Sequence, residues 1–534
     1  MTFSSPSALR AFPIRHRPAT VLVIAGFIVF AAVLASYIFY EVTHPEIVTS
    51  YSVDLHVYRI GGLIVRHIRP YYDPHAATPL YDWPGYTSFK LKFTYPPFAA
   101  VLFAVVSVIR WPVLLKLTDL ANIGLPVATL WFTYGALGYR RSWQVRLGAT
   151  LLTAAAVFWT EPVLRNIYVG QVNEALMALI IWDLCQPDTE ASRGWKGAGV
   201  GIAAGIKLVP LIFIPYLLLA RKFRQAAVAG AAFAATVLAG FVVLPRDSAK
   251  WWFSGLFVNE TGRTGFAGWT GNQSLHGLIT RLMGSVAGPE HAWLVVAALT
   301  ALLGVVCAAL LDRQGHLVAG ILTCALTGLL VSPISWDHHW VWIIPGVALA
   351  GHHAAHAMAA SARGAAAGQP APQRWAARAR GWASSPAGWG YWALVAGMLA
   401  IFGAWPNILW HEPKSAAVDR FGVIWAPPST GPTTYARFGD LPSYAEYHWH
   451  GFQLIVGNAF VLTGLLLFGL LLVLAWIAPA APPATAPVTI GPHRGAATPA
   501  GGQGLAADPA RAALPSPGPP PDDAQRDTAC GEGR

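Results

Sequence analysis

The sequence predicts an all-α protein that crosses a membrane about twelve times. Charged residues make up only 11% of its 534 residues, against about 25% in soluble globular proteins. Apolar and aromatic residues reach 55%, and they occur in long runs between short polar stretches, as in bilayer-spanning helices. This composition excludes a secreted disulfide scaffold and a soluble single-domain enzyme.

The N-terminal segment, residues 1–19, precedes the first predicted crossing. Arg10, Arg15 and Arg17 are followed by an apolar run at residues 20–40, which is long enough to span a core of about 30 Å. A cleaved signal peptide is the alternative, because Val33-Leu34-Ala35 resembles a cleavage site. The run exceeds a usual signal-peptide core, so we expect an uncleaved helix with residues 1–19 in the cytoplasm.

The first outer segment, residues 41–110, is predicted to hold two helices that do not cross. In the first, Leu55, Tyr58 and Ile60 lie opposite Arg59 and Arg66, which is typical of an amphipathic helix on the membrane surface. The second, residues 98–109, is only about 18 Å long and is therefore expected to be interfacial or re-entrant.

Positive charges fix the direction of the later crossings. Had residues 98–109 crossed, Arg140, Arg141 and Arg146 would face outward, which the positive-inside rule disfavours. A Gly-rich helix pair is divided at Lys207, because that places the ammonium at the outer surface and avoids a cost of about 3 kcal/mol at the bilayer centre. The expected crossings are residues 20–40, 111–137, 147–161, 171–186, a pair within 195–220, 226–244, 291–311, 317–332, 337–352, 389–409 and 451–478.

The domain organisation follows from these crossings. A transmembrane core, residues 20–352, carries the outer loops 41–110 and 245–290. An Arg-rich loop, residues 353–388, is expected in the cytoplasm near anionic lipid. The last two crossings, within 389–478, enclose an outer loop at 410–450, and the Pro-, Ala- and Gly-rich residues 479–534 are expected to be a disordered cytoplasmic tail.

Common catalytic motifs are missing from the sequence. It has no phosphate-binding G-x-x-x-x-G-K-[ST] loop, no G-x-G-x-x-G, no H-E-x-x-H, no G-x-S-x-G and no D-x-D. Its four cysteines have no C-x-x-C spacing. The consecutive Asp337, His338 and His339 point about 100° apart on a helix and so cannot converge on one ion. We therefore expect no metal ligands and no cofactor, and a metal requirement of the reaction does not follow from the sequence.

Two charged residues stand out at the outer ends of predicted helices. Asp54 opens the amphipathic helix, where it is either the N-cap or, as a carboxylate at neutral pH, a general base. Lys207 lies at the break between two apolar halves, where it either extends to the surface or binds a phosphate.

Uncharged polar groups gather at the same side. Gln171 and Asn173 either hold helices together or bind a sugar. Thr94 with Pro97 is typical of a helix start. One histidine of the pair His338 and His339, flanked by interfacial tryptophans, is expected to face a lipid phosphate.

A series of motifs resembles glycosyltransferase family 87. They are Val53-Asp54-Leu55-His56-Val57-Tyr58, Phe93-Thr94-Tyr95-Pro96-Pro97-Phe98, Gly170-Gln171-Val172-Asn173, Gly205-Ile206-Lys207-Leu208-Val209-Pro210, Asn272-Gln273-Ser274 and Ser332-Pro333-Ile334-Ser335-Trp336 with His338-His339-Trp340. The resemblance covers residues 50–345, in order, and leaves out 353–534.

The resemblance implies a bundle of the glycosyltransferase C superfamily with its site on the outer face of the plasma membrane. It implies transfer of mannose from polyprenol-phosphate-mannose to a glycolipid acceptor of the phosphatidylinositol mannoside or lipomannan type, with inversion and an α-1,2 linkage. Asp54 would be the catalytic base, and Lys207, His338 and His339 would bind the donor phosphate. The implied substrate contacts are His56, Tyr58, Tyr95, Gln171, Asn173, Asn272, Gln273 and Trp336.

Two other functions remain open from the sequence. An arabinofuranosyltransferase would use the same lipid phosphate with another sugar. A secondary transporter fits about twelve crossings, although such folds usually have paired broken helices and the break at Lys207 has no counterpart. No nucleic-acid partner is expected, and the oligomeric state does not follow from the sequence.

Overall fold

The computed structural model describes residues 16–43, 52–67, 79–83, 85, 91–256, 267–284, 289–406, 420–428 and 445–477. All of them belong to one compact unit, residues 1–482. The expectations for the segment before residue 16, most of the loop 410–450 and the tail 479–534 lie outside the described residues.

Five long apolar helices confirm five of the predicted crossings. Each has enough residues and apolar character to span a bilayer. They are α1 (His16–Thr43), α5 (Trp111–Ala136), α12 (Phe223–Val243), α16 (Pro289–Arg313) and α22 (Ala459–Ile477). The last was predicted to start at residue 451, but a separate short helix, α21 (Phe452–Gly457), precedes it, and the buried Asn458 between them accepts hydrogen bonds from Arg281.

The other helices of the bundle are shorter or more polar. The count of twelve crossings therefore stays a prediction. These helices are α6 (Trp143–Phe158), α8 (Asn173–Leu184), α10 (Ala198–Ile206), α11 (Phe213–Leu219), α17 (Leu317–Val331), α18 (Ile343–Ala366) and α20 (Pro386–Phe402). Short turns of helix connect some of them: η2 (Tyr139–Arg141), α9 (Glu190–Arg193), η3 (Val209–Ile212) and η4 (Asp337–Trp342).

A sharp bend precedes α8. The helix α7 (Glu161–Val169) and α8 are inclined by 117°. Gly170, with a φ of +68°, ends α7 in the left-handed conformation that favours glycine. A Cβ atom there would lie 2.6 Å from the Cβ of Leu55, so the glycine also permits close approach to the first outer helix.

The two predicted outer helices are present. They are α3 (Val53–Val65) and α4 (Pro97–Val106), and the apolar side predicted for α3 is buried. Gly62 lies against the backbone of Phe103, which brings the two helices into contact. The N-cap positions are Ser52 and Pro96, so the alternatives that made Asp54 and Thr94 caps are wrong.

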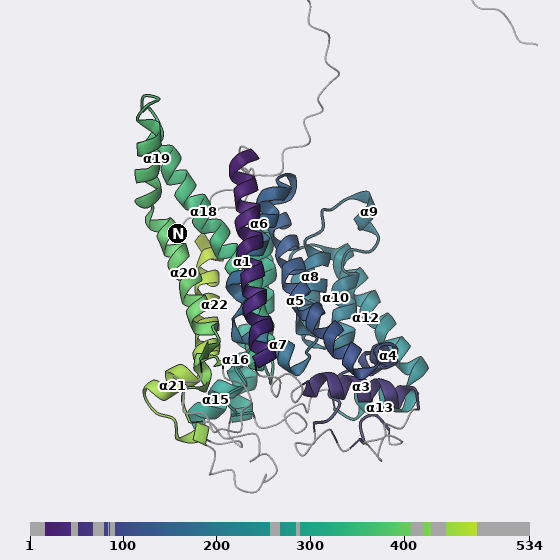
Figure 1. Ribbon diagram of the computed structural model, residues 1–534. Coiled ribbons are helices and arrows are strands. Elements are labelled where there is room, and N and C mark those ends of the chain that lie inside the picture. The colour runs from purple at the N-terminus through teal and green to yellow at the C-terminus, as the bar shows by residue number, and fades with distance from the viewer. Residues whose placement is uncertain are drawn as a thin grey trace, which may run out of the picture. The chain divides into compact units, whose positions relative to one another are not determined.

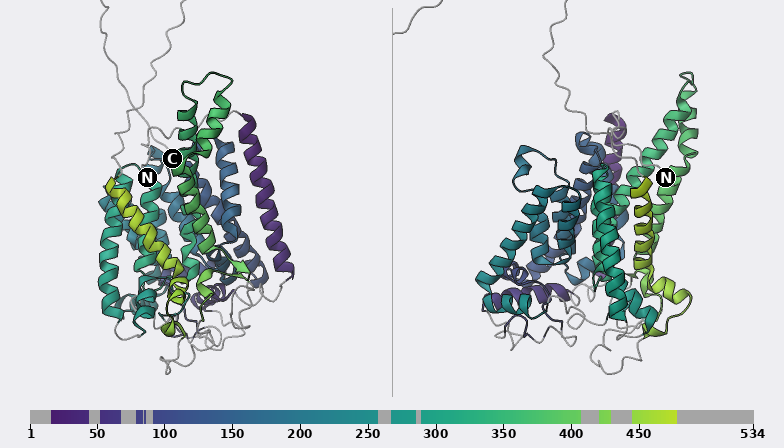
Figure 2. Two further views of the ribbon diagram at one scale, coloured as in Figure 1. Left: turned by 90° about the vertical axis from the view of Figure 1, so that its left-hand side faces the viewer. Right: turned by 180° about the vertical axis from the view of Figure 1, so that it is seen from behind.

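One end of the bundle collects several short helices (Figure 1). There α3 and α4 lie near α13 (Pro245–Phe253), while α15 (Leu275–Met283) and α21 lie at the same end, and α9 and α19 (Arg374–Ala383) lie at the opposite end. Figure 2 shows the same separation of the two ends from two further directions. The strands β1 (Trp405–Pro406) and β2 (Arg420–Phe421) pair antiparallel, followed by η6 (Val423–Trp425) and η9 (Ala445–His448).

The Arg-rich segment 353–388 is not the loop that the sequence predicts. Helix α18 continues to Ala366, and after a turn α19 packs back against it. The segment is rich in alanine, the residue with the highest helix propensity, which favours continuation of the helix. The crossing predicted at 389–409 instead ends at Phe402, because Gly403 is extended and β1 follows.

Candidate active site

Four breaks in the helices bring together the residues that the sequence singles out. Asp54 lies in the first turn of α3, and Asn173 begins α8 just after the bend. Lys207 ends α10, and His339 lies in η4 between α17 and α18. Helix ends have backbone groups without intrahelical partners, so polar side chains are favoured at these positions.

Asp54 is held by one side-chain hydrogen bond. Its Oδ2 accepts from Nε2 of Gln171 at 2.8 Å, and its Oδ1 accepts no hydrogen bond from the described part of the chain. Burial raises the pKa of Asp54, while His338, the Gln171 hydrogen bond, Lys207 and Arg165 oppose this shift. Asp54 thus has a free acceptor oxygen and a pKa that burial raises, while the neighbouring Lys207 and Arg165 limit the rise.

Two tyrosines orient the amide of Gln171. The Tyr58 hydroxyl donates to Oε1 of Gln171 at 2.8 Å and lies 2.7 Å from the Tyr95 hydroxyl, which is 3.4 Å from the same Oε1. Burial raises the pKa of Tyr58 well above its ordinary value, so its hydroxyl remains a donor. With Oε1 fixed in this way, Nε2 must face Asp54.

Lys207 is held between an amide and an imidazole. Its Nζ donates to Oδ1 of Asn173 at 2.9 Å and lies 2.9 Å from Nε2 of His339. Burial, together with Lys207 and His338, lowers the pKa of His339 well below its ordinary value. A neutral His339 therefore accepts a hydrogen bond from the lysine ammonium.

The end of α10 that carries Lys207 packs against α12. Gly205, two residues before Lys207, lies against Thr236 of α12. Asn173 and His339 supply the polar partners that a partly buried lysine requires. The placement of Lys207 at the outer surface stays a prediction.

A narrow cavity of about 50 Å³ adjoins Lys207. Asn173, Lys207, Ser335 and His339 line it with polar groups, and the rest of its wall is mainly apolar. The apolar residues come from α8, η3, α11, α17 and η4 and include Leu176, Met177, Ile180, Ile212, Phe213, Ala325 and Leu329.

His338 is oriented by an ion-pair network. Its Nδ1 lies 3.0 Å from Oδ1 of Asp337, and Oδ2 of Asp337 accepts from Nε of Arg165 at 3.1 Å. Burial opposes ionisation of Asp337, but Arg165 and His338 hold its pKa below the usual range. The buried Nε2 of His338 has no hydrogen-bond partner among the described residues. It can therefore form a hydrogen bond with a ligand that reaches it.

Asn272, Gln273 and Trp336 occupy an adjoining outer loop. The side chain of Asn272 bonds the backbone of Ala267, Pro333 and Ser335. Gln273 likewise bonds backbone groups of Thr270, Gly457 and Val461. Trp336 contacts Trp269 with ring centroids 5.3 Å apart, and its backbone pairs with that of Asn272. These contacts fix the loop before the histidines, and direct sugar contacts by these residues stay a prediction.

His56 faces away from the tyrosines around Gln171. It stacks on Trp111 at 3.7 Å between ring centroids. Burial, with the nearby Arg59, lowers the pKa of His56 to about 4. Its predicted role as a substrate contact is not tested by this arrangement.

The structure adds Arg165 and Asn166 to the site. Asn166 donates to the backbone oxygens of Pro162 and His338 at 2.6 and 2.7 Å, and its Oδ1 accepts from Asn173 at 3.2 Å. Both residues lie on α7, which is largely buried. The signal in the sequence that could have indicated them is the presence of an arginine and an asparagine in this segment. No group of three or more His, Cys, Asp or Glu suited to a metal ion occurs among the described residues.

The chain is similar to known glycosyltransferases. The sequence profile of glycosyltransferase family 87 matches residues 93–333, a range that includes Lys207 but neither Asp54 nor His338. No solved structure matches the chain.

Three relatives have closely related names. A polyprenol-phosphate-mannose-dependent alpha-(1-2)-phosphatidylinositol pentamannoside mannosyltransferase of Mycobacterium tuberculosis (strain CDC 1551 / Oshkosh) is 36% identical over 55% of this chain and 64% of its own length. An alpha-(1-2)-phosphatidylinositol mannoside mannosyltransferase of the same donor dependence, from M. tuberculosis (strain ATCC 25618 / H37Rv), is 34% identical over 57% of this chain and 71% of its own length. A phosphatidylinositol pentamannoside mannosyltransferase of Mycolicibacterium smegmatis is 35% identical over 55% of this chain and 68% of its own length.

Proposed function

Because this chain belongs to glycosyltransferase family 87, we propose that it transfers mannose from polyprenol-phosphate-mannose to a mannosylated phosphatidylinositol lipid. The linkage formed would be α-1,2, as the names of the relatives state for those enzymes. The observation that carries this proposal is the arrangement of Asp54, with a free carboxylate oxygen, beside the cations Lys207 and Arg165 and the histidine His338.

The carboxylate is proposed to act as the general base. An acceptor hydroxyl would donate its proton to Oδ1 of Asp54 as its oxygen attacks the anomeric carbon of mannose. The bond from that carbon to the phosphate oxygen would break, and polyprenol phosphate would leave with the bonding electrons. Attack from the side opposite the phosphate inverts the anomeric centre.

The cationic side is proposed to hold the donor phosphate. Lys207 would place its ammonium against the developing negative charge, and His338 would use its free Nε2. His339 instead accepts a hydrogen bond from Lys207 and thereby positions it. Of the two histidines, His338 is therefore the one that we assign to the phosphate.

The site is proposed to face outward across a plasma membrane. Arg193, Arg221 and Arg224 line a pocket at the far ends of α8 and α10, and the positive-inside rule favours the cytoplasm for that end. Twelve crossings, with α4 as an interfacial or re-entrant helix, are consistent with this orientation.

Incubation of purified protein with radiolabelled polyprenol-phosphate-mannose and a series of phosphatidylinositol mannosides tests the proposal. We expect a labelled glycolipid whose label an α-1,2-specific mannosidase releases. Polyprenol-phosphate-arabinose serves as the control donor and should give no product. Absence of labelled lipid with every mannosylated acceptor, or transfer from the arabinose donor alone, would contradict the assignment.

A further inference from the structure

A second pocket lies at the end of α8 and α10 that is remote from Asp54. Its volume is about 460 Å³, within the range of roughly 300–1,000 Å³ found for small-molecule sites. Its lining comes from two segments, Asp188–Arg193 around α9 and Arg221–Gln225 between α11 and α12. Helix α8 begins at Asn173 in the candidate active site and ends at Leu184, so its 12 residues separate the two sites by about 18 Å.

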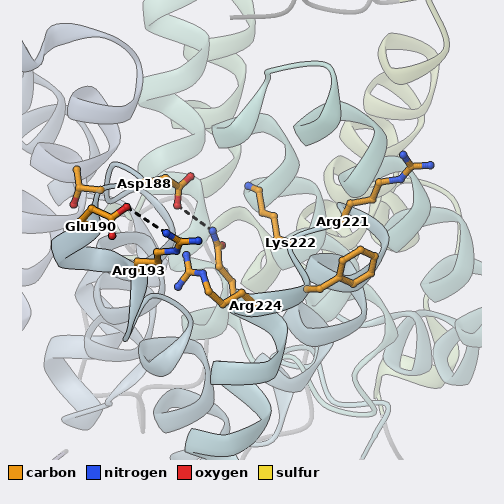
Figure 3. Close-up of a pocket in the computed structure, with 9 residues that line it drawn as sticks. Asp188, Glu190, Arg193, Arg221, Lys222 and Arg224 are labelled. Carbon is orange, nitrogen blue, oxygen red and sulfur yellow. Dashed lines mark hydrogen bonds and ion pairs between the residues drawn. The ribbon is translucent and has the colours of Figure 1, made fainter. Parts of the chain in front are cut away.

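The pocket has an excess of positive charge. Glu190 pairs with Arg193 at 3.3 Å, Asp188 with Lys196 at 3.1 Å, and Lys222 with Asp312 at 2.6 Å. Within the described part of the chain, Arg221 and Arg224 have no carboxylate partner. Figure 3 shows the side chains of Arg193 and Arg224 near each other, with Arg221 directed away from them.

Groups that recognise a phosphate and hydroxyls surround the same space. Helix α12 begins here at Phe223 without a side-chain cap, so its first N–H groups and its dipole favour an anion. Gln225 is 5% exposed and donates from Nε2 to Asp188 at 3.2 Å, while its Oε1 has no partner among the described residues. That oxygen can accept a hydrogen bond from a hydroxyl group of a ligand.

The pocket lies where the lipid-facing surface begins. Phe223 borders it and is 63% exposed, and Leu218 and Leu219 of the adjoining α11 are also exposed. Exposed large apolar side chains on a membrane helix face acyl chains, and aromatic ones favour the level of the head groups. A phospholipid can therefore place its head group in the pocket and its chains along α11 and α12.

We propose that this pocket binds an anionic phospholipid with a hydroxylated head group, such as a phosphatidylglycerol or a phosphatidylinositol, from the leaflet opposite the candidate active site. The N-terminus of α12 and Arg193 and Arg224 hold the phosphate, and Gln225 contacts a hydroxyl of the head group.

Lipid binding to the purified full chain tests this proposal. Native mass spectrometry in detergent would compare the retention of three lipids. We expect phosphatidylglycerol to be retained most, phosphatidic acid less and phosphatidylcholine least. The Arg193→Gln/Arg224→Gln double variant should bind phosphatidylglycerol about 30-fold more weakly, since each basic residue near a lipid surface contributes about 1 kcal/mol. The control is Arg246→Gln, an exposed arginine on α13 at the opposite end of the bundle, which should bind as the wild type does.

Two further measurements distinguish the outcomes. Phosphatidylglycerol should slow hydrogen exchange at residues 221–226 of the wild type. This measurement does not depend on the folding of a variant. Glycerol 3-phosphate and inorganic phosphate should protect these residues far less, because they lack the chains. Equal protection by either soluble anion, equal binding of phosphatidylcholine, or equal loss in Arg246→Gln would overturn the proposal. None of these readouts depends on sugar transfer.

Discussion

At the residue scale, the central feature is the carboxylate of Asp54, which is oriented through one oxygen and keeps its other oxygen free of hydrogen bonds from the described residues. Gln171 occupies one oxygen of Asp54, and Tyr58 and Tyr95 fix the direction of that amide. In the proposed mechanism, Oδ1 takes the proton of the acceptor, and the nearby Lys207 binds the donor phosphate.

Replacement of Asp54 by Asn should abolish most transfer. The amide cannot take the proton of the acceptor, and a general base contributes typically about 10²–10⁴-fold to rate. The measurement is kcat with labelled donor, and the control is Asp82→Asn, an exposed carboxylate that pairs with Lys250. Wild-type turnover in Asp54→Asn would eliminate the base assignment.

The pH dependence should follow from the raised pKa of Asp54. The base must be ionised, and a raised pKa means that it is protonated at a higher pH than a free aspartate, whose pKa is about 3.9. The acidic limb of kcat/KM should therefore fall above that value, with activity lost as the pH decreases through it. An acidic limb at or below pH 3.9 would contradict this expectation.

Replacement of Lys207 by Ala should weaken use of the donor more than that of the acceptor. A hydrogen bond to a charged group contributes about 1.5–3 kcal/mol, so the KM for polyprenol-phosphate-mannose should rise by roughly 10- to 150-fold. Steady-state kinetics with each substrate varied in turn measure the split. Equal effects on both KM values would argue against a phosphate role.

At the element scale, glycines allow the helices that carry the site to approach closely. Gly201 faces the backbone of Ala229, which brings α10 against α12, and Gly62 faces the backbone of Phe103. An added Cβ would lie 2.2 Å and 2.3 Å from these backbone oxygens. The position of α3, and with it Asp54, therefore depends on the absence of a side chain at residue 62.

Replacement of Gly62 by Ala should lower stability and activity together. The methyl group must push α3 from α4, and overpacking costs typically about 1–3 kcal/mol. Thermal unfolding in detergent and the transfer assay measure the two effects. The control is Gly124→Ala in α5, where a Cβ would meet nothing within 4 Å. An unchanged melting temperature for Gly62→Ala would show that the two helices can separate freely.

At the scale of the whole molecule, the candidate active site and the basic pocket lie at opposite ends of the bundle. α8 and α10 both run between the candidate active site and the basic pocket. The proposed function needs the first end outside the cell and the second inside, and this orientation can be measured directly.

Single-cysteine labelling should separate the two ends. Arg246→Cys on α13 and Arg378→Cys on α19 introduce exposed thiols, and Cys185, Cys307 and Cys324 are buried, so only Cys530 must first be replaced. A membrane-impermeant maleimide should label residue 246 in intact cells and residue 378 only after permeabilisation. The reverse pattern would place Asp54 on the cytoplasmic side and exclude the proposed use of an outer-leaflet donor.

The sequence by itself determined the membrane class, five long apolar helices and the helix break at Lys207, and it singled out Asp54, Lys207 and the pair His338 and His339 as candidate site residues. These follow from local signals: apolar length, glycine, proline and charges that are costly in a bilayer. Only the tertiary structure decided that Gln171 orients Asp54, that His339 supports Lys207 while Asp337 and Arg165 orient His338, and that α18 continues past residue 352. The contacts of Gln171 with Asp54, of His339 with Lys207 and of Arg165 with Asp337 join side chains more than a hundred residues apart, and no periodicity along the chain encodes which helix ends meet in space.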